Sequence, residues 1–125
     1  MRDNVIVTKS IVFAIKVVNL YKHLCSEKKE FVLSKQLLRS GTSIGANVRE
    51  AVNSQSKREF IAKMNISLKE AAETEYWIEL LQKTDYLTEA EYEVFNRDCD
   101  ELKRLLVSII KTSNQKINQP VNITK

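Results

Sequence analysis

Glycine and proline are scarce in this sequence of 125 residues, which contains two glycines and one proline. An average protein has about 7% glycine and 5% proline. Sandwiches, barrels and Rossmann folds need glycines in their turns and phosphate-binding loops, so this shortage argues against all three fold types. The chain has the length of one domain, and 43% of its residues are hydrophobic, which is enough to form a core. We therefore expect an all-α protein.

Residue types that often carry out chemistry are also scarce. The single histidine, His23, excludes histidine-rich zinc sites and di-iron bundles, and it falls on the polar side of its predicted helix. Cys25 and Cys99 are far apart in the sequence and fit the small buried thiols of a reduced cytoplasmic protein. The N-terminal residues lack the pattern of a signal sequence, and no apolar run is long enough to cross a membrane, so we expect neither element. We expect a cytoplasmic protein with no catalytic residues, no metal and no cofactor, and without membrane contact.

Apolar residues recur at helical spacing in four segments. Helices are predicted over about residues 8–26, 34–53, 56–83 and 88–111. The links between them are short and favour antiparallel neighbours, which predicts an up-down-up-down four-helix bundle over residues 1–111. Residues 112–125 are polar and cannot bury enough surface to order themselves, so we expect a disordered C-terminal tail there.

Capping residues mark the beginnings of these helices. Thr8 and Ser34 are the predicted N-caps of the first and second helices. The third helix begins with a capping box formed by Ser56 and Glu59. In the fourth, Thr88 and Glu91 take the same roles.

Both glycines, Gly41 and Gly45, fall on the apolar face of the second predicted helix. A glycine inside a helix costs up to about 1 kcal/mol relative to alanine. Their position therefore predicts a close backbone approach to a neighbouring helix, as in other contacts between small residues.

Two of the predicted helices carry more apolar surface than one packed neighbour needs. The first helix has two adjoining apolar stripes, one of them through Ile11, Ala14 and Val18, so either the helix is central or its second stripe faces another subunit. The third helix has a second apolar patch opposite its main face, which an oligomer would use. The residues assigned to an oligomer interface are Phe13, Val17, Leu20, Leu24, Ile66, Trp77, Leu80 and Leu81.

One carboxylate, Glu75, falls in the middle of the apolar face of the third helix. Burying a carboxylate without a partner is costly, so we expect it to meet an Arg, a Lys or a hydroxyl from another helix. A role as a general base is the alternative, but no nucleophile or second acid–base group accompanies it. The predicted buried polar network consists of Asn47, Glu50, Glu70 and Glu75.

Positive charge is concentrated in the first half of the chain. Eleven cations and four carboxylates give residues 1–58 a net charge of +7, whereas residues 59–111 carry −5. This asymmetry fits a basic binding face or complementary docking between neighbouring subunits. Phosphate backbones bind such basic stripes because neutralised phosphates release their counterions, although a merely solvated face is the alternative. The candidate nucleic-acid-binding residues are Lys35, Arg39, Arg49, Lys57 and Arg58, with Lys9, Lys16 and Lys22 as additions.

Four stretches of the sequence together form a signature: residues 40–51 (SGTSIGANVREA), 56–60 (SKREF), 66–71 (ISLKEA) and 73–77 (ETEYW). They resemble the four-helix-bundle proteins encoded in intervening sequences of bacterial 23S rRNA genes, some of which carry a ribosomal-protein label. The resemblance covers roughly residues 8–110. One departure is Ala51, where many members have glycine.

This resemblance implies an antiparallel bundle that assembles as a homopentamer around a central channel, without enzymatic activity. It also implies a distant similarity to the accessory bundle protein of diversity-generating retroelements, a basic pentamer associated with nucleic acid and a reverse transcriptase. A ring would repeat the basic stripe and add avidity. We therefore predict a non-enzymatic, homo-oligomeric helical scaffold that binds RNA or DNA through phosphate contacts. The alternative is a protein–protein interaction adaptor with no nucleic-acid role.

Overall fold

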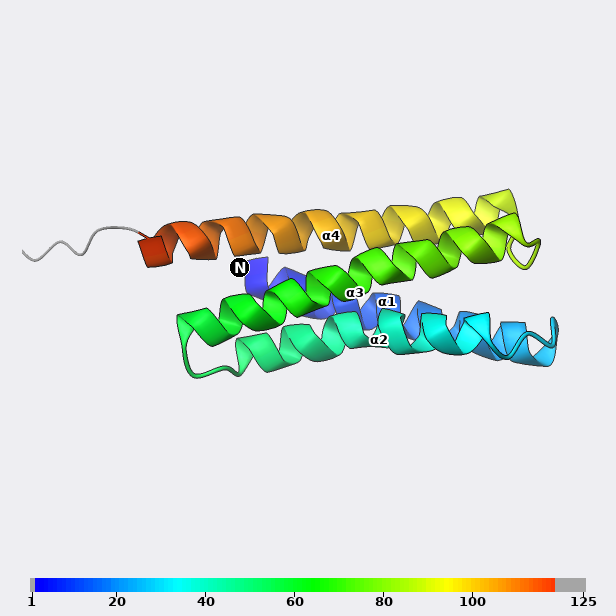
Figure 1. Ribbon diagram of the computed structural model, residues 1–125, viewed down its shortest axis with the longest axis horizontal. Coiled ribbons are helices and arrows are strands. Elements are labelled where there is room, and N and C mark those ends of the chain that lie inside the picture. The colour runs from blue at the N-terminus through cyan, green and yellow to red at the C-terminus, as the bar shows by residue number, and fades with distance from the viewer. Residues whose placement is uncertain (1, 119–125) are drawn as a thin grey trace, which may run out of the picture.

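The computed structural model describes the backbone of residues 2–118 and the side chains of residues 5–117. This part of the chain consists of four helices joined by short links and contains no strand: α1 (Arg2–Ser26), α2 (Leu33–Val52), α3 (Lys57–Lys83) and α4 (Glu89–Asn118). Each helix packs against the next one, and α1 meets α4 along the least extensive of the four contacts (Figure 1). The predicted antiparallel four-helix bundle is confirmed.

The core lies along the axis of the bundle, and all four helices contribute to it. Apolar side chains without exposed surface alternate with small residues that bring the helices close together. Between α2 and α3, the Ser67 hydroxyl donates to the Ile44 carbonyl oxygen at 2.8 Å, and the Thr74 hydroxyl donates to Ser40 Oγ at 2.9 Å. The largest fully buried side chains include Val17, Leu24, Leu37, Ile44, Met64, Ile78, Leu102 and Leu106.

The two cysteines are free thiols that differ in burial. Cys99 is fully buried in α4 and donates to the Ala71 carbonyl oxygen of α3 at 3.3 Å. Burial is the main reason that the pKa of this thiol is raised to about 12, so Cys99 stays protonated and unreactive. Cys25 is half-buried and lies 3.8 Å from the Ser34 hydroxyl.

Two helix boundaries differ from the prediction. Helix α1 already begins at Arg2, so Thr8 lies inside the helix and is not its N-cap. Helix α4 continues to Asn118, beyond the predicted boundary at residue 111. Residues 112–118, which were expected to belong to a disordered tail, are therefore helical, and Ser113 among them is buried. The remainder of the expected tail, residues 119–125, lies outside the described residues.

The beginning of α2 is capped by a side chain that sequence reasoning did not select. The Glu30 carboxylate, and not Ser34, accepts hydrogen bonds from the backbone N–H groups of Val32, Leu33 and Ser34 at 2.6–3.1 Å. The Ser34 hydroxyl instead donates to the Glu30 carbonyl oxygen at 2.8 Å. Burial opposes ionisation of Glu30, but the three backbone hydrogen bonds outweigh it and hold the pKa of the carboxyl below its usual 4.5.

The predicted capping box is reciprocal at α4, whereas at α3 the carboxylate bonds the N–H of the residue before the N-cap. At α3, Ser56 Oγ accepts from the Glu59 N–H at 3.0 Å, while the Glu59 carboxylate reaches back to the Gln55 N–H, also at 3.0 Å. At α4, Thr88 and Glu91 bond each other's backbone N–H groups at 3.1 and 2.8 Å. These bonds satisfy N–H groups that have no partner inside the helix.

Candidate interaction surfaces

The apolar stripe of α1 that was assigned to an oligomer interface forms the core of the bundle instead. Phe13, Val17, Leu20 and Leu24 are at most 7% exposed, and Leu81 of α3 is fully buried. The prediction of an interface through these five residues is wrong, because their side chains already pack against the other helices of the same chain. A helical wheel shows two stripes but does not tell which of them faces inward.

The remaining residues assigned to the interface lie on α3. Ile66 is 40% exposed, whereas Trp77 and Leu80 are half-buried. The Trp77 indole N–H donates to the Glu73 carboxylate at 2.9 Å, and its ring meets Tyr76 edge to face. This patch is therefore small and partly occupied by contacts within the chain.

A larger exposed apolar surface lies on the other side of α1. We use the name α1 outer face for four aliphatic side chains, Val5, Ile11, Val12 and Ile15, which are 38–53% exposed. Aliphatic side chains that are clustered and half exposed typically mark a contact surface, whereas single ones carry no such meaning. Each edge of this face borders a groove.

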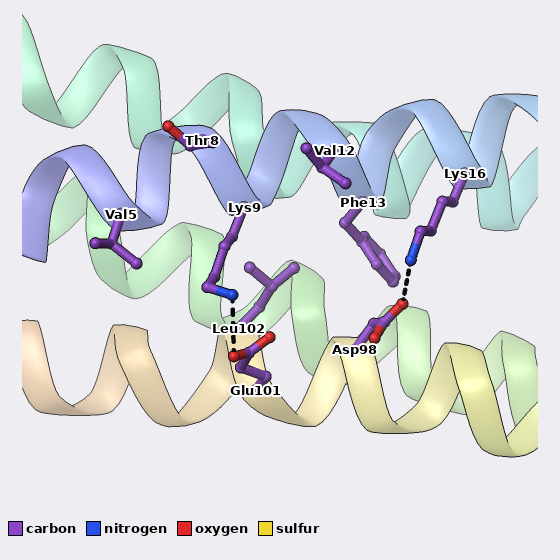
Figure 2. Close-up of a pocket in the computed structure, with 9 residues that line it drawn as sticks. All are labelled: Val5, Thr8, Lys9, Val12, Phe13, Lys16, Asp98, Glu101 and Leu102. Atoms are coloured by element: carbon purple, nitrogen blue, oxygen red, sulfur yellow. Dashed lines mark hydrogen bonds and ion pairs between the residues drawn. The ribbon is translucent and has the colours of Figure 1, made fainter.

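The first groove, of about 590 Å³, runs between α1 and α4 (Figure 2). Lys9 forms an ion pair with Glu101 at 3.2 Å. Further along α1, Lys16 pairs with Asp98 at 2.8 Å. The groove therefore has apolar walls crossed by two ion pairs, with no unmatched charge among its lining residues. It is lined by Val5, Thr8, Lys9, Val12, Phe13, Lys16, Asp98, Glu101 and Leu102.

The second groove, of about 450 Å³, runs between α1 and α2. Its α1 wall consists of Ile11, Ala14, Ile15 and Val18 together with two polar residues, and small residues of α2 such as Gly45 keep it open. Together with the first groove, it makes the α1 outer face an apolar strip with charged groups at its edges. Protein–protein interfaces have the same composition, an apolar centre and a polar rim.

The predicted basic stripe on α2 does not form one surface. The Arg39 guanidinium bonds to the carboxylates of Glu70 (3.2 Å) and Glu73 on α3. Its positive charge is therefore already matched within the chain. Lys35 is exposed near the beginning of α2, roughly 20 Å along the helix from Arg49.

Three cations of the predicted set lie at the same end of the bundle, where α2 turns into α3, with Arg49 on the side of the α1–α2 groove. Arg49 lies in the last turn of α2, and Lys57 and Arg58 begin α3. All three are exposed, and none has a carboxylate within ion-pair distance among the described side chains. We call Arg49, Lys57 and Arg58 the turn cluster.

The residues of the predicted polar network occupy separate places. Glu75 accepts from Lys103 of α4 at 2.7 Å, so the structure provides the expected cross-helix partner. Glu50 pairs with Lys63 of α3 at 2.8 Å. Glu70 is the partner of Arg39, whereas Asn47 donates to a carbonyl oxygen of its own helix. These groups form isolated pairs with partly exposed side chains, and they do not form one buried network.

A third cleft, of about 490 Å³, lies at the same end of the bundle as the turn cluster, between the α2–α3 turn and the last turns of α4. Lys57 and Lys116 line it together with several hydroxyl groups. Sequence reasoning missed the contribution of α4, because Ser113 and Lys116 fall in the segment that was expected to be a tail.

Other kinds of site find no support in the part of the chain that the structure describes. Within it, no three His, Cys, Asp or Glu side chains come together in a way that could hold a metal ion. None of the four helices has an apolar stretch long enough to span a bilayer over its described residues.

Comparison with known proteins identifies relatives of this chain. Residues 2–108 match the family model described as 23S rRNA-intervening sequence protein. A crystal structure from Bacteroides thetaiotaomicron, described as a protein of unknown function from the S23 ribosomal protein family, is 61% identical in sequence. The match covers 89% of this chain and 99% of that one, with a TM-score of 0.88. No curated protein matches the chain.

Proposed function

The chain belongs to the 23S rRNA-intervening sequence protein family, and on this basis we propose that it is a non-enzymatic, homo-oligomeric scaffold that binds RNA or DNA through phosphate contacts. The observation that carries the proposal is the difference between the cations of α1 and α2. Lys9, Lys16 and Arg39 are matched by carboxylates of neighbouring helices. The turn cluster is left for an external anion.

Self-assembly is supported by the α1 outer face. Ile11, Val12 and Ile15 each expose 44–53% of their surface, and an apolar strip of this kind gains stability when a second molecule covers it. We propose that copies of the chain pack through this face into a pentamer, the number that the family resemblance implies. Each subunit would then contribute one turn cluster to the assembled particle.

Repetition of the turn cluster is what makes phosphate binding effective. Three cations on one subunit release few counterions when they bind a nucleic acid, so a single subunit binds weakly. Several clusters on one rigid particle bind the same strand or duplex together, and this multivalency raises the affinity of the particle above that of one subunit. Such contacts position a backbone but do not read its bases.

The test removes the charge of the turn cluster. We expect the variant Arg49→Gln/Lys57→Gln/Arg58→Gln to bind structured RNA and duplex DNA more weakly than the unmodified chain. Fluorescence anisotropy over a range of salt concentrations measures this, and the slope of log Kd against log salt should fall by about 1 for each phosphate that the variant no longer neutralises.

The matched control removes three charges at the opposite end of the bundle. Lys28, Lys29 and Lys83 are exposed in the α1–α2 link and at the end of α3, so their triple exchange to Gln changes the net charge equally. Retained binding by this control supports the turn cluster. Equal loss of binding in both triple variants would show that only net charge matters, which contradicts the proposed site.

The adaptor function is a second candidate because both grooves beside the α1 outer face are large enough to accept side chains of a partner helix. It predicts a purified chain that does not bind RNA or DNA even at low salt.

A further inference from the structure

The cleft at the α2–α3 turn differs in charge from the two grooves beside α1. The α1–α4 groove contains two lysines and two carboxylates, and the α1–α2 groove is mainly apolar. The turn cleft is lined by Lys57 and Lys116 without any carboxylate. The α1–α2 groove also lacks a carboxylate, but Arg49 is its single cation. With two cations and several hydroxyl groups, the turn cleft is the best suited of the three to an anion.

Hydroxyl groups in this cleft have protons available for an anion. Ser56 Oγ accepts a hydrogen bond from the Glu59 N–H, so its own O–H is left to donate. Ser113 also lines the cleft and is only 7% exposed, and its O–H group can donate to a molecule bound there. An oxyanion in the cleft would accept hydrogen bonds from these hydroxyl groups, and each such bond lowers the free energy of the complex.

The first turn of α3 adds to the attraction for an anion. Ser56 caps the helix, so the N-terminal end of this 27-residue helix, with its partial positive charge, adjoins the cleft. The Glu59 carboxylate accepts from the backbone N–H of Gln55, so this N–H is not available to an anion. The donors that line the cleft include the two lysine ammonium groups and the hydroxyls of Ser56 and Ser113.

The other part of the lining is apolar. Val52, Phe60 and Ile109 contribute to it, and the total volume of about 490 Å³ lies in the range of pockets that hold small organic ligands. A lone phosphate ion would leave this apolar part empty. A phosphate that carries a sugar and a base would cover it, since a base packs well against an aromatic or aliphatic side chain.

We propose that this cleft binds one nucleoside phosphate unit, with the phosphate at Lys57, Lys116 and Ser113 and the nucleoside against Phe60 and Ile109. The inference rests on the proposed nucleic-acid function and gives it a defined subsite. The unit is either one nucleotide of a bound strand or a free mononucleotide, because both present the same chemistry to the cleft.

The experiment records ¹H–¹⁵N spectra of the full chain during titration with uridine 5′-monophosphate, with inorganic phosphate and with uridine. We expect the monophosphate to shift the backbone amide signals of residues 54–57 and 113–116. It should bind at least about tenfold more tightly than inorganic phosphate or uridine alone. Ser113→Ala and Lys116→Gln should each weaken it by up to about tenfold, the usual effect of losing one hydrogen bond. Lys111→Gln, an exposed control on α4 that does not line the cleft, should leave it unchanged.

Several outcomes would overturn the inference. The absence of shifts in these two segments would do so, and so would unchanged binding in both cleft variants. Equal affinity for phosphate and for the monophosphate would reduce the cleft to a simple oxyanion site and contradict the nucleoside part.

A parallel titration with a long structured RNA separates this inference from the proposed function and distinguishes the two sources of the unit. If the RNA binds through the turn cluster but Ser113→Ala changes the binding of neither ligand, the proposed function is supported and the nucleotide subsite is contradicted. If the monophosphate binds in the cleft while the RNA does not bind at all, the subsite stands as a mononucleotide site and the proposed function fails.

Discussion

At the scale of single residues, the two glycines of α2 have different roles although they lie four positions apart on the same face. A Cβ atom added at Gly41 would lie 2.8 and 2.9 Å from the two methyl groups of Val17, which is fully buried in α1. A Cβ atom at Gly45 would have its nearest neighbour, Ser10 Oγ, at 3.3 Å. Only Gly41 therefore occupies a place where no larger residue fits.

This difference predicts unequal effects on stability. Gly41→Ala should lower the free energy of unfolding by about 1–3 kcal/mol, because the fully buried Val17 would have to shift. Gly45→Ala should change it by less than about 1 kcal/mol, since the better helix propensity of alanine offsets the small shift required of Ser10. Urea denaturation followed by circular dichroism measures both. An equal loss of stability in the two variants would contradict the close approach at Gly41.

Whether a residue is predictable from sequence depends on how local its contacts are. The capping boxes at Ser56 and Thr88 were predictable because all partners lie within a few positions. The partner of Glu75 was predictable only by type, since Lys103 is 28 residues away. Arg39 was assigned to an external phosphate because nothing in the sequence shows that Glu70 and Glu73 lie opposite it.

At the scale of the helices, α2 depends on the link that precedes it. The Glu30 carboxylate caps three backbone N–H groups at the beginning of this helix, which has no acidic residue in its own first turn. The charged form of Glu30 is favoured in the folded chain, so its pKa lies below the unfolded value of 4.5. Its stabilising contribution is therefore fully present above pH 4.5 and is lost as the pH falls through the lower, folded-state pKa.

We predict that Glu30→Gln lowers the free energy of unfolding by about 1 kcal/mol at pH 7, a typical cost for a lost helix cap. The difference in the free energy of unfolding between the variant and the unmodified chain should become smaller below pH 4.5, as Glu30 becomes protonated. Thermal unfolding at a series of pH values checks this, with Glu27→Gln as an exposed control in the same link. A gap that stays constant down to low pH would show that the charge of Glu30 is not what caps α2.

The orientation of α1 was beyond prediction from its sequence. Both of its stripes are apolar, and the choice between them is made by α2 and α4, which cover Val17 and Phe13. The end of α4 was also missed, because the polar residues after Thr112 suggest a loop when considered alone. In the bundle, Ser113 is buried and lines the cleft at the α2–α3 turn, and α4 continues beyond it to Asn118.

At the scale of the whole molecule, the separation of charge along the sequence becomes a pairing of helices. Lys9 and Lys16 of α1 bond to carboxylates of α4, and Arg39 of α2 bonds to carboxylates of α3. These pairs explain much of the difference between a basic first half and an acidic second half without a partner molecule. The overall fold was predictable because it follows from periodicity and link length. The binding surfaces were not, because the cations without a carboxylate partner can be identified only once the helices are placed next to one another.

The central claim is that copies of the chain assemble through the α1 outer face, and light scattering on the purified chain tests it most directly. Ile15→Glu places a charge in the middle of this face, whereas Val107→Glu makes the same kind of change on α4 at a side chain of similar exposure, 50% against 53%. We predict that the unmodified chain and Val107→Glu are oligomers and that Ile15→Glu has a mass close to the 14.4 kDa of one chain with its helix content unchanged. An unmodified chain of 14.4 kDa, or an Ile15→Glu variant as large as Val107→Glu, would contradict the claim.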